Sequence, residues 1–264
     1  MKIKILRIFF IGLFFVFLCI SNVRAIPSML CSVPTTDILA SHSAQIMLLA
    51  HYEFIYPDKA LQPADGHLSS KMSGIEYGLS NHVEFGFDYV YDKKFERDGF
   101  YPTSFNLKWR ILNEEKGSKF SMAIGSFFIG SKSFEDLNFT AFKASPYIVF
   151  TKKFTPVRLH LGYAENCSGY HYITYVENGK PLLKSNSGIL CGIDGTLIKA
   201  KNPVTAYVDY IGGSEPFWGV GVSQPISPKW SWSYCYFKPG QQKLGEAESP
   251  SSHWVALYYT LFFK

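Results

Sequence analysis

The sequence has few cysteines, little excess charge and, past residue 25, no long apolar run and no amphipathic helix of convincing length. None of its five cysteines forms a Cys-x-x-Cys pair, which argues against a zinc site and against a small disulfide-rich fold. Four basic residues lie within the first 25 positions, so the net charge of +5 falls to about +1 for the rest. This balance gives no support for a nucleic-acid partner.

The chain opens with the pattern of a secretory signal peptide. Three basic residues precede an apolar stretch at 8–20, and small or modest residues end this region at Ala25. The apolar stretch is shorter than the roughly 20 residues that a membrane-spanning helix needs. We therefore expect residues 1–25 to be a cleaved signal peptide and residues 26–264 to form one domain.

Aromatic residues and alternating segments are what the sequence has in abundance. In residues 82–92, HVEFGFDYVYD, Phe85 and Phe87 share one parity whereas Glu84 and Asp88 share the other. A strand would place these two sets on opposite faces. Such segments recur twelve times, each near the 9–11 residues of a tilted membrane strand, at 43–54, 70–79, 82–92, 103–112, 119–128, 140–151, 156–165, 187–199, 203–211, 215–224, 229–237 and 252–263.

The connections between these segments alternate in length, with 211–215 as a short exception. Tight turns on a periplasmic rim and longer loops on an exterior rim produce this rhythm in membrane barrels. We therefore expect residues 79–82 and 151–156 to face the periplasm and residues 55–69 and 166–186 to be exposed at the cell surface.

The residues of the two strand faces indicate which face is outside. Segments 103–112 and 229–237 place tryptophan, tyrosine and leucine on one face and serine or charged residues on the other. A soluble β-sandwich, the alternative, would favour densely packed aliphatic residues in its core. Wide aromatic residues near strand ends suit a membrane interface. The pattern therefore predicts aromatic residues facing lipid and charges facing a lumen.

The final segment, HWVALYYTLFFK, resembles the last strand of bacterial outer-membrane β-barrel proteins, which alternates apolar residues and ends in an aromatic one. Lys264 after Phe263 is a departure by one residue. The resemblance implies an all-β fold, an up-and-down antiparallel transmembrane β-barrel of about twelve strands, with ten as the alternative. It also implies location in the bacterial outer membrane, contact with outer-membrane lipids, and recognition by the outer-membrane assembly machinery through the C-terminal strand.

Twelve strands enclose more space than their side chains need to fill. Twelve-stranded membrane barrels include small-solute channels and an outer-membrane phospholipase. We expect a porin-like channel for small solutes, with no cofactor, metal site or catalytic residues. The alternatives are a lipid-modifying hydrolase and a structural or adhesive protein acting through exterior loops, of which 166–186 would plug or cap the barrel. Ser252-His253 does not support catalysis, because neighbours on a strand point to opposite faces.

The charged and polar residues on the inward parity are the candidate lumen and constriction residues: Arg158, His160, Asp194, Asp209, Glu84, Asp88, Lys108 and Arg110. If strands pair symmetrically about their connections, Asp194 and Asp209 lie at the same height, with Arg158 close to Asp194. Adjacent carboxylates repel one another unless a cation or a proton intervenes.

The interpretation that follows is a polar constriction formed by Arg158, His160, Asp194 and Asp209, and the alternative is a wall network whose members only satisfy one another. The same symmetry places Asp88 near Lys108, and Glu84 diagonal to Arg110. A disulfide between Cys31 and Cys167 is left open by the sequence.

Overall fold

The computed structural model describes the chain at residues 29–31, 33–54, 66–92, 103–131, 143–165, 175–177, 180–182, 187–213, 216–239, 243–244, 247–248 and 251–263. The expected signal peptide therefore lies outside the described residues, as do Cys167 and most of the loops 55–69 and 166–186. Among the residues described, no helix is long and apolar enough to cross a membrane.

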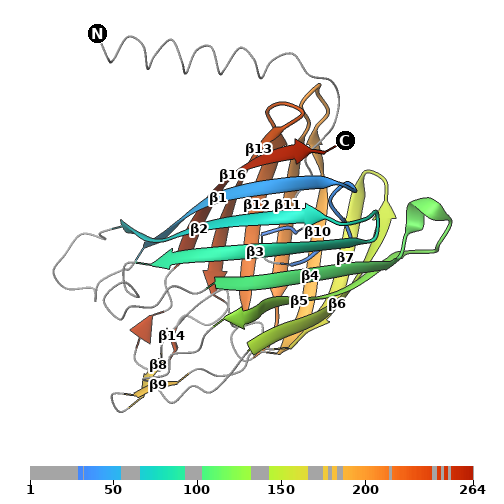
Figure 1. Cartoon of the computed structure of the whole chain (residues 1–264). Helices are drawn as coiled ribbons and strands as arrows, with labels where there is room; N and C mark the ends of the chain where they lie inside the picture. The colour runs from blue at the N-terminus through green and yellow to red at the C-terminus, as the bar shows by residue number, and fades with distance from the viewer. Residues whose placement is uncertain are drawn as a thin grey trace, which may run out of the picture.

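Twelve antiparallel strands form a closed barrel, which confirms the predicted fold class and strand number (Figure 1). The predicted ends differ from the observed ones by at most four residues, at the start of β2. The strands of the barrel are β1 (Ser43–Phe54), β2 (Gly66–Gly78), β3 (Val83–Asp92), β4 (Thr103–Leu112), β5 (Ser121–Ser131), β6 (Lys143–Phe154), β7 (Val157–Ala164), β10 (Gly188–Ile198), β11 (Val204–Ile211), β12 (Phe217–Pro225), β13 (Trp230–Pro239) and β16 (Ser251–Phe262).

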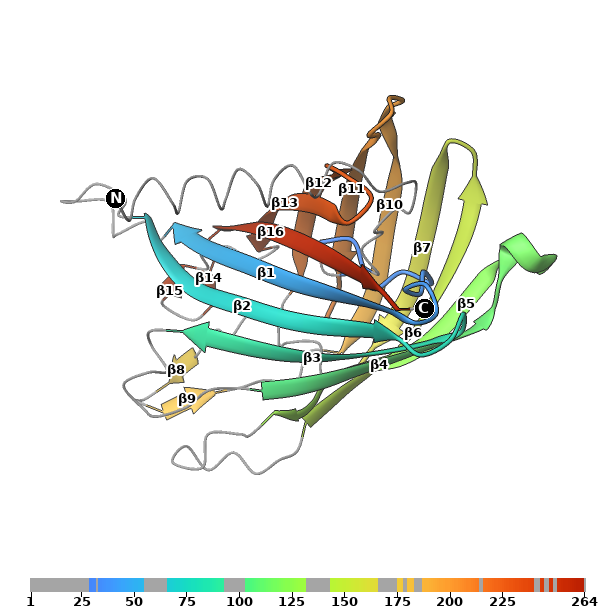
Figure 2. The ribbon, with the colours of Figure 1, turned by 45° about the horizontal axis from the view of Figure 1, so that its top comes forward.

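The barrel closes where the first and last strands pair. β1 and β16 lie side by side in Figure 2, and their register runs from Ser43 opposite Phe262 to Phe54 opposite Ser251. Every other neighbour in the ring is the next barrel strand along the chain. A closed ladder leaves no strand edge unpaired, which is the condition for crossing a bilayer with strands.

The two faces of the wall carry different residues. On β3, Phe85 and Phe87 are exposed on the outside, whereas Glu84 and Asp88 are buried on the inside. Large apolar side chains are exposed along the other strands too, with Leu161 on β7 exposed by 58%. The alternation therefore gives an apolar outer surface and places the charged residues inside, as the sequence predicts. The interior also holds a cluster of buried apolar side chains, among them Leu190, Phe237 and Trp254.

Short connections and both ends of the ring gather at one rim. The turns 79–82, 155–156, 199–203 and 226–229 lie there, together with the 3-10 helix η2 (Glu114–Lys116). Two small hairpins lie at the other end of the barrel (Figure 1): β8 (Tyr175–Glu177) with β9 (Lys180–Leu182), and β14 (Lys243–Leu244) with β15 (Ala247–Glu248). That the short-turn rim faces the periplasm stays a prediction.

The leucines on the outer surface allow a test of whether a charged substitution destabilises the barrel more at the middle of the bilayer than near its edge. Leu161 lies near the middle of β7 and Leu197 near the short-turn end of β10, and both are exposed. Leu161→Arg should lower the free energy of unfolding in lipid vesicles by about 2–4 kcal/mol, and Leu197→Arg by about 0–1 kcal/mol, because charge costs most at the bilayer centre. Denaturant titration measures both. Equal small losses would mean that this surface does not face lipid.

Candidate functional site in the barrel lumen

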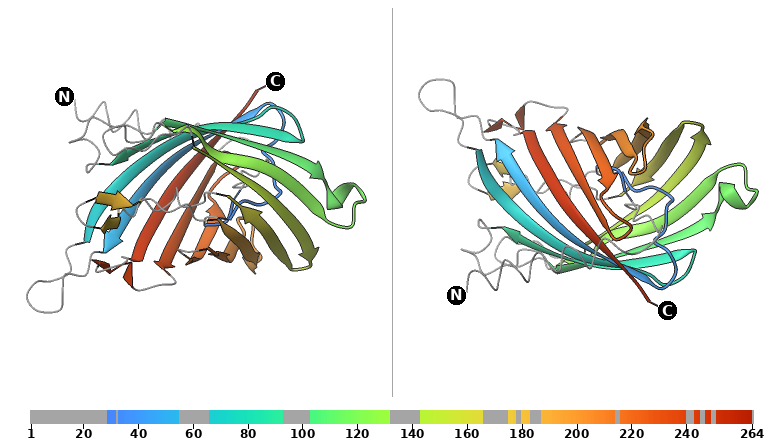
Figure 3. Two further views of the ribbon diagram at one scale, coloured as in Figure 1. Left: turned by 90° about the horizontal axis from the view of Figure 1, so that it is seen from below. Right: turned by 90° about the horizontal axis from the view of Figure 1, so that it is seen from above.

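The chain that precedes β1 lies inside the barrel. Figure 3 shows this blue stretch within the ring of strands, and Val33, Thr35 and Thr36 are almost completely buried. The amide of Leu30 donates to the carbonyl oxygen of Val33 at 2.9 Å and closes a tight turn. We refer to residues 29–42 as the N-terminal segment.

Arg158 on β7 joins the N-terminal segment to the wall. Its Nη1 donates to both carboxylate oxygens of Asp37, at 2.9 and 2.8 Å, and its Nε donates to Oδ1 of Asp194 at 2.9 Å. Asp194 on β10 stands directly opposite Arg158 in the strand register. The next inward residue, His160, has Nε2 3.4 Å from Asp194 and Nδ1 2.9 Å from the hydroxyl of Thr151. One guanidinium thus makes charge-assisted hydrogen bonds to a strand and to the segment.

A buried ion pair on β3 and β4 holds the same segment from another side. Nζ of Lys108 lies 2.8 Å from Oε1 of Glu84, and it also donates to the carbonyl oxygen of Asp37 at 3.2 Å. Oε2 of Glu84 accepts from the amide of Leu39 at 2.8 Å. Both charges therefore have further hydrogen bonds, which a buried ion pair needs in order to be tolerated.

Asp209 on β11 makes the third polar contact with the segment. Its Oδ2 accepts a hydrogen bond from the amide of Val33 at 2.9 Å. The neighbouring strands carry glycine beside it: Gly192 and Gly219 both stand opposite Asp209. A Cβ atom at Gly192 would lie 2.4 Å from Cδ1 of Leu30, so the absence of a side chain there lets the segment pack against the wall.

One of the two pairings expected between β3 and β4 is wrong in register. Asp88 stands opposite Ser104 and accepts from the side-chain amide of Asn106 at 2.9 Å, whereas Lys108 stands opposite Glu84. Arg110 does stand diagonal to Glu84, because Lys108 is the residue opposite Glu84, but its guanidinium donates to the carbonyl oxygen of Asn81 in a rim turn. The long connection between β3 and β4 does not impose symmetrical pairing. A shift of register by an even number of residues keeps each side chain on its face.

The expected side-by-side placement of Asp194 and Asp209 is also wrong. Asp194 stands opposite Tyr207, and the register of β10 with β11 shifts at an irregularity between Thr196 and Ile198. The two carboxylates are thereby offset by two residues along the strands. Each takes a different partner, Arg158 for Asp194 and the backbone of the N-terminal segment for Asp209.

Asp37 is the site residue that the sequence analysis missed. It is the only charged residue between positions 26 and 42, and this isolation is the one signal in the sequence that could have marked it. No periodicity places residues 29–42 on a strand or a helix. Their position inside the lumen follows only from the closed barrel around them.

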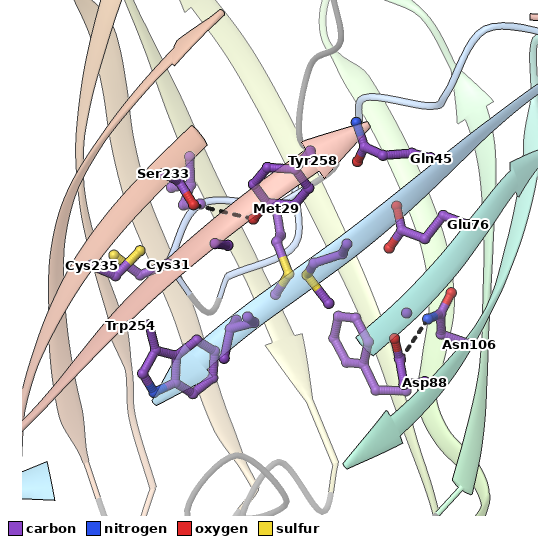
Figure 4. Close-up of a pocket in the computed structure, with 16 residues that line it drawn as sticks. Met29, Cys31, Gln45, Glu76, Asp88, Asn106, Ser233, Cys235, Trp254 and Tyr258 are labelled. Atoms are coloured by element: carbon purple, nitrogen blue, oxygen red, sulfur yellow. Dashed lines mark hydrogen bonds between the residues drawn. The ribbon is translucent and has the colours of Figure 1, made fainter. Parts of the chain in front are cut away.

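The N-terminal segment borders two cavities in the lumen. One has a volume of about 290 Å³ near the short-turn rim, where Arg158 and Asp194 line it together with hydroxyl-bearing residues. The other, about 50 Å³, is mostly apolar but has Glu76 and Asp88 in its wall (Figure 4). Leu30 lines both cavities. Within the described residues, no cluster of three or more histidine, cysteine or acidic side chains could hold a metal ion.

Comparison with known proteins identifies the class of fold. No family model matches the sequence, and no curated protein matches it either. Among solved structures, the KdgM porin is 12% identical with a TM-score of 0.51, over 81% of this chain and 98% of that chain. The NanC porin is 7% identical with a TM-score of 0.51, over 82% of this chain and 100% of that chain. The chain thus has the fold of bacterial outer-membrane β-barrels, as its last strand implied.

The contacts of Asp37 predict how firmly the N-terminal segment is held. Asp37→Asn keeps the size of the side chain but removes its charge, and the ion pair with Arg158 is about a quarter exposed. Losing such a pair should lower the free energy that holds the segment against the wall by about 1 kcal/mol. The hydrogen-exchange rates of the Val33 and Leu39 amides should therefore rise about fivefold. Hydrogen exchange in detergent micelles, followed by NMR, measures this.

The matched control is Glu114→Gln. Lys152 donates to Glu114 in the rim turn and holds the pKa of this carboxyl below its ordinary value, but Glu114 touches no part of the N-terminal segment in the contacts described. Its loss should leave both amides unchanged. If Asp37→Asn also left them unchanged, Arg158 would not hold the segment.

Proposed function

We propose that this protein is an outer-membrane channel for small solutes, with a lumen of mixed charge that its own N-terminal segment narrows. The observation that carries the proposal is a closed twelve-stranded barrel with an apolar exterior, whose interior carries charged side chains beside a cluster of apolar ones. The barrel fold shared with the KdgM and NanC porins supports it. Outer-membrane lipids would contact the exposed apolar band, and the assembly machinery would recognise β16.

Arg158, His160, Asp194 and Asp209 are, in this proposal, the residues that tune passage. The cavity of about 290 Å³ beside Arg158 gives a small solute room at the short-turn rim. Carboxylates outnumber cationic groups along the described inner wall and the segment. A lumen with this excess favours cations over anions. The carboxylates are Asp37, Glu76, Glu84, Asp88, Asp194 and Asp209, and the cationic side chains on the same face are Lys108, Arg110, Lys153 and Arg158.

A lipid hydrolase receives no support from the contacts of His253 and His160. His253 lies at a hydrogen-bonding distance of 2.6 Å from the Tyr234 hydroxyl and packs against Tyr236, whereas its neighbour Ser252 is buried on the other face. His160 contacts Thr151 and Asp194 inside the lumen. We therefore assign these histidines to the wall of a channel that does no chemistry on its solute.

Bilayer recording tests the channel proposal. The purified protein should give stepwise currents in a planar bilayer, with a preference for potassium over chloride that comes from the inner carboxylates. Replacing Asp194 and Asp209 together by Asn keeps their shape and should lower the potassium-to-chloride permeability ratio about twofold.

Glu114→Gln, which removes a charge outside the lumen, should leave the permeability ratio unchanged. A folded double variant with unchanged selectivity would remove Asp194 and Asp209 from the pathway. Absence of current from folded protein, together with release of fatty acid from lipid vesicles, would favour the hydrolase.

A further inference from the structure

Two cysteines that are far apart in the sequence meet inside the lumen. Cys31 belongs to the tight turn of the N-terminal segment and is 2% exposed, and Cys235 is an inward residue of β13 that is 5% exposed. Figure 4 shows the two sulfur atoms next to each other, one from the segment and one from the wall.

Glycines on β12 make this approach possible. A Cβ atom at Gly219 would lie only 2.7 Å from Cβ of Cys31, so any side chain there would displace the segment. The next inward residue, Gly221, stands opposite Cys235 in the register. Cys31 therefore lies in the space that β12 leaves open directly beside Cys235.

The third described cysteine has a different environment. Cys191 on β10 shares the parity of Ile189 and Ile193, which are exposed on the outer surface, whereas Leu190 on the other parity is buried. Within the described parts of the chain, Cys31 and Cys235 are thus the two cysteines that lie next to each other, and both carry free thiols in this structure. An exported protein reaches an oxidising compartment, where paired thiols become disulfides.

We propose that Cys31 and Cys235 form a disulfide that fastens the N-terminal segment to the wall of the barrel. The reaction is thiol–disulfide exchange with a protein disulfide of the exporting compartment. The thiolate of one cysteine attacks that disulfide and forms a mixed disulfide. The second cysteine then displaces the oxidant's sulfur, so the Cys31–Cys235 bond forms and the oxidant is reduced to a dithiol, whose two sulfurs take up the two protons that the cysteine thiols lose.

The order of events follows from burial. The thiolate is the reacting species, and burial raises the pKa of the Cys31 thiol well above its ordinary value. Exchange is therefore fast while the segment still enters the barrel and slow after it is enclosed. The same enclosure slows the attack of reductants on the finished disulfide.

The disulfide has a consequence for the proposed channel, and this part of the inference rests on the proposed function. Ion pairs and hydrogen bonds at Asp37, Val33 and Leu39 hold the segment reversibly, because each can break and reform. A covalent bond at Cys31 keeps the tip of the segment in the lumen even when these contacts open. Oxidised protein should therefore conduct less than reduced protein.

The first measurement is peptide mapping by mass spectrometry of protein exported in cells, purified under thiol-blocking conditions without reductant. A linked peptide containing Cys31 and Cys235 is expected in most molecules. Cys191→Ser, the matched control, should leave it unchanged, and Cys235→Ser should remove it. Free, alkylated Cys31 and Cys235 in folded wild-type protein would overturn the proposal, as would a Cys31–Cys167 link.

The second measurement is bilayer recording before and after adding a membrane-permeant dithiol. Wild-type protein should become several-fold more conductive on reduction, whereas Cys235→Ser should show the higher conductance from the start and not respond. Equal conductance of oxidised and reduced wild-type protein would overturn the fastening role. A linked peptide in a protein that gives no current in any form would support the disulfide and contradict the channel, so the two failures are distinguishable.

Discussion

The pairing of β1 with β16 is the constraint on which the rest of the structure depends. It joins the two ends of the sheet over the full length of both strands, from Ser43 to Phe54 and from Ser251 to Phe262. In hydrocarbon an unpaired backbone amide or carbonyl costs several kcal/mol, so an open edge at this position would exclude the wall from a membrane. Once the ring is closed, each strand has one face toward lipid and one toward a confined interior.

The confined interior then needs partners for its charges. Arg158, Glu84 and Asp209 each bind a part of the N-terminal segment, through the carboxylate of Asp37 or through backbone amides. These contacts also satisfy the segment. Within the described residues it pairs with no strand of the barrel, so the wall carboxylates accept the hydrogen bonds of its backbone amides. The charged residues of the lumen therefore hold the N-terminal segment in place, in addition to any effect that they have on a passing solute.

Much of this architecture could be predicted because it repeats along the chain. The alternation at Phe85 and Glu84 identifies both faces of a strand without knowledge of its neighbours, and the rhythm of the turns gives the order of strands. The inward orientation of Arg158 and Asp194 follows from the same parity. Such features are local, and a shift of register by two residues does not change them.

The contacts between strands, and those with the N-terminal segment, could not be predicted, because they depend on the register and not on the local alternation. The register of β10 with β11 depends on an irregularity at Thr196, and a period-two pattern contains no sign of it. The N-terminal segment has no periodicity at all, and its position depends on glycines such as Gly192 and Gly219, which come from distant strands. Asp37, as an isolated charge, becomes meaningful only when Arg158 is seen to lie beside it.

The central claim is that the N-terminal segment lies inside the lumen between these wall groups. Nuclear Overhauser contacts in the folded protein test it most directly, because the amide of Val33 lies 2.9 Å from Oδ2 of Asp209 and the amide of Leu39 lies 2.8 Å from Oε2 of Glu84. The account predicts contacts from the Val33 amide proton to side-chain protons of Asp209, and from the Leu39 amide proton to those of Glu84. Absence of both, with amide shifts typical of unstructured chain, would contradict it.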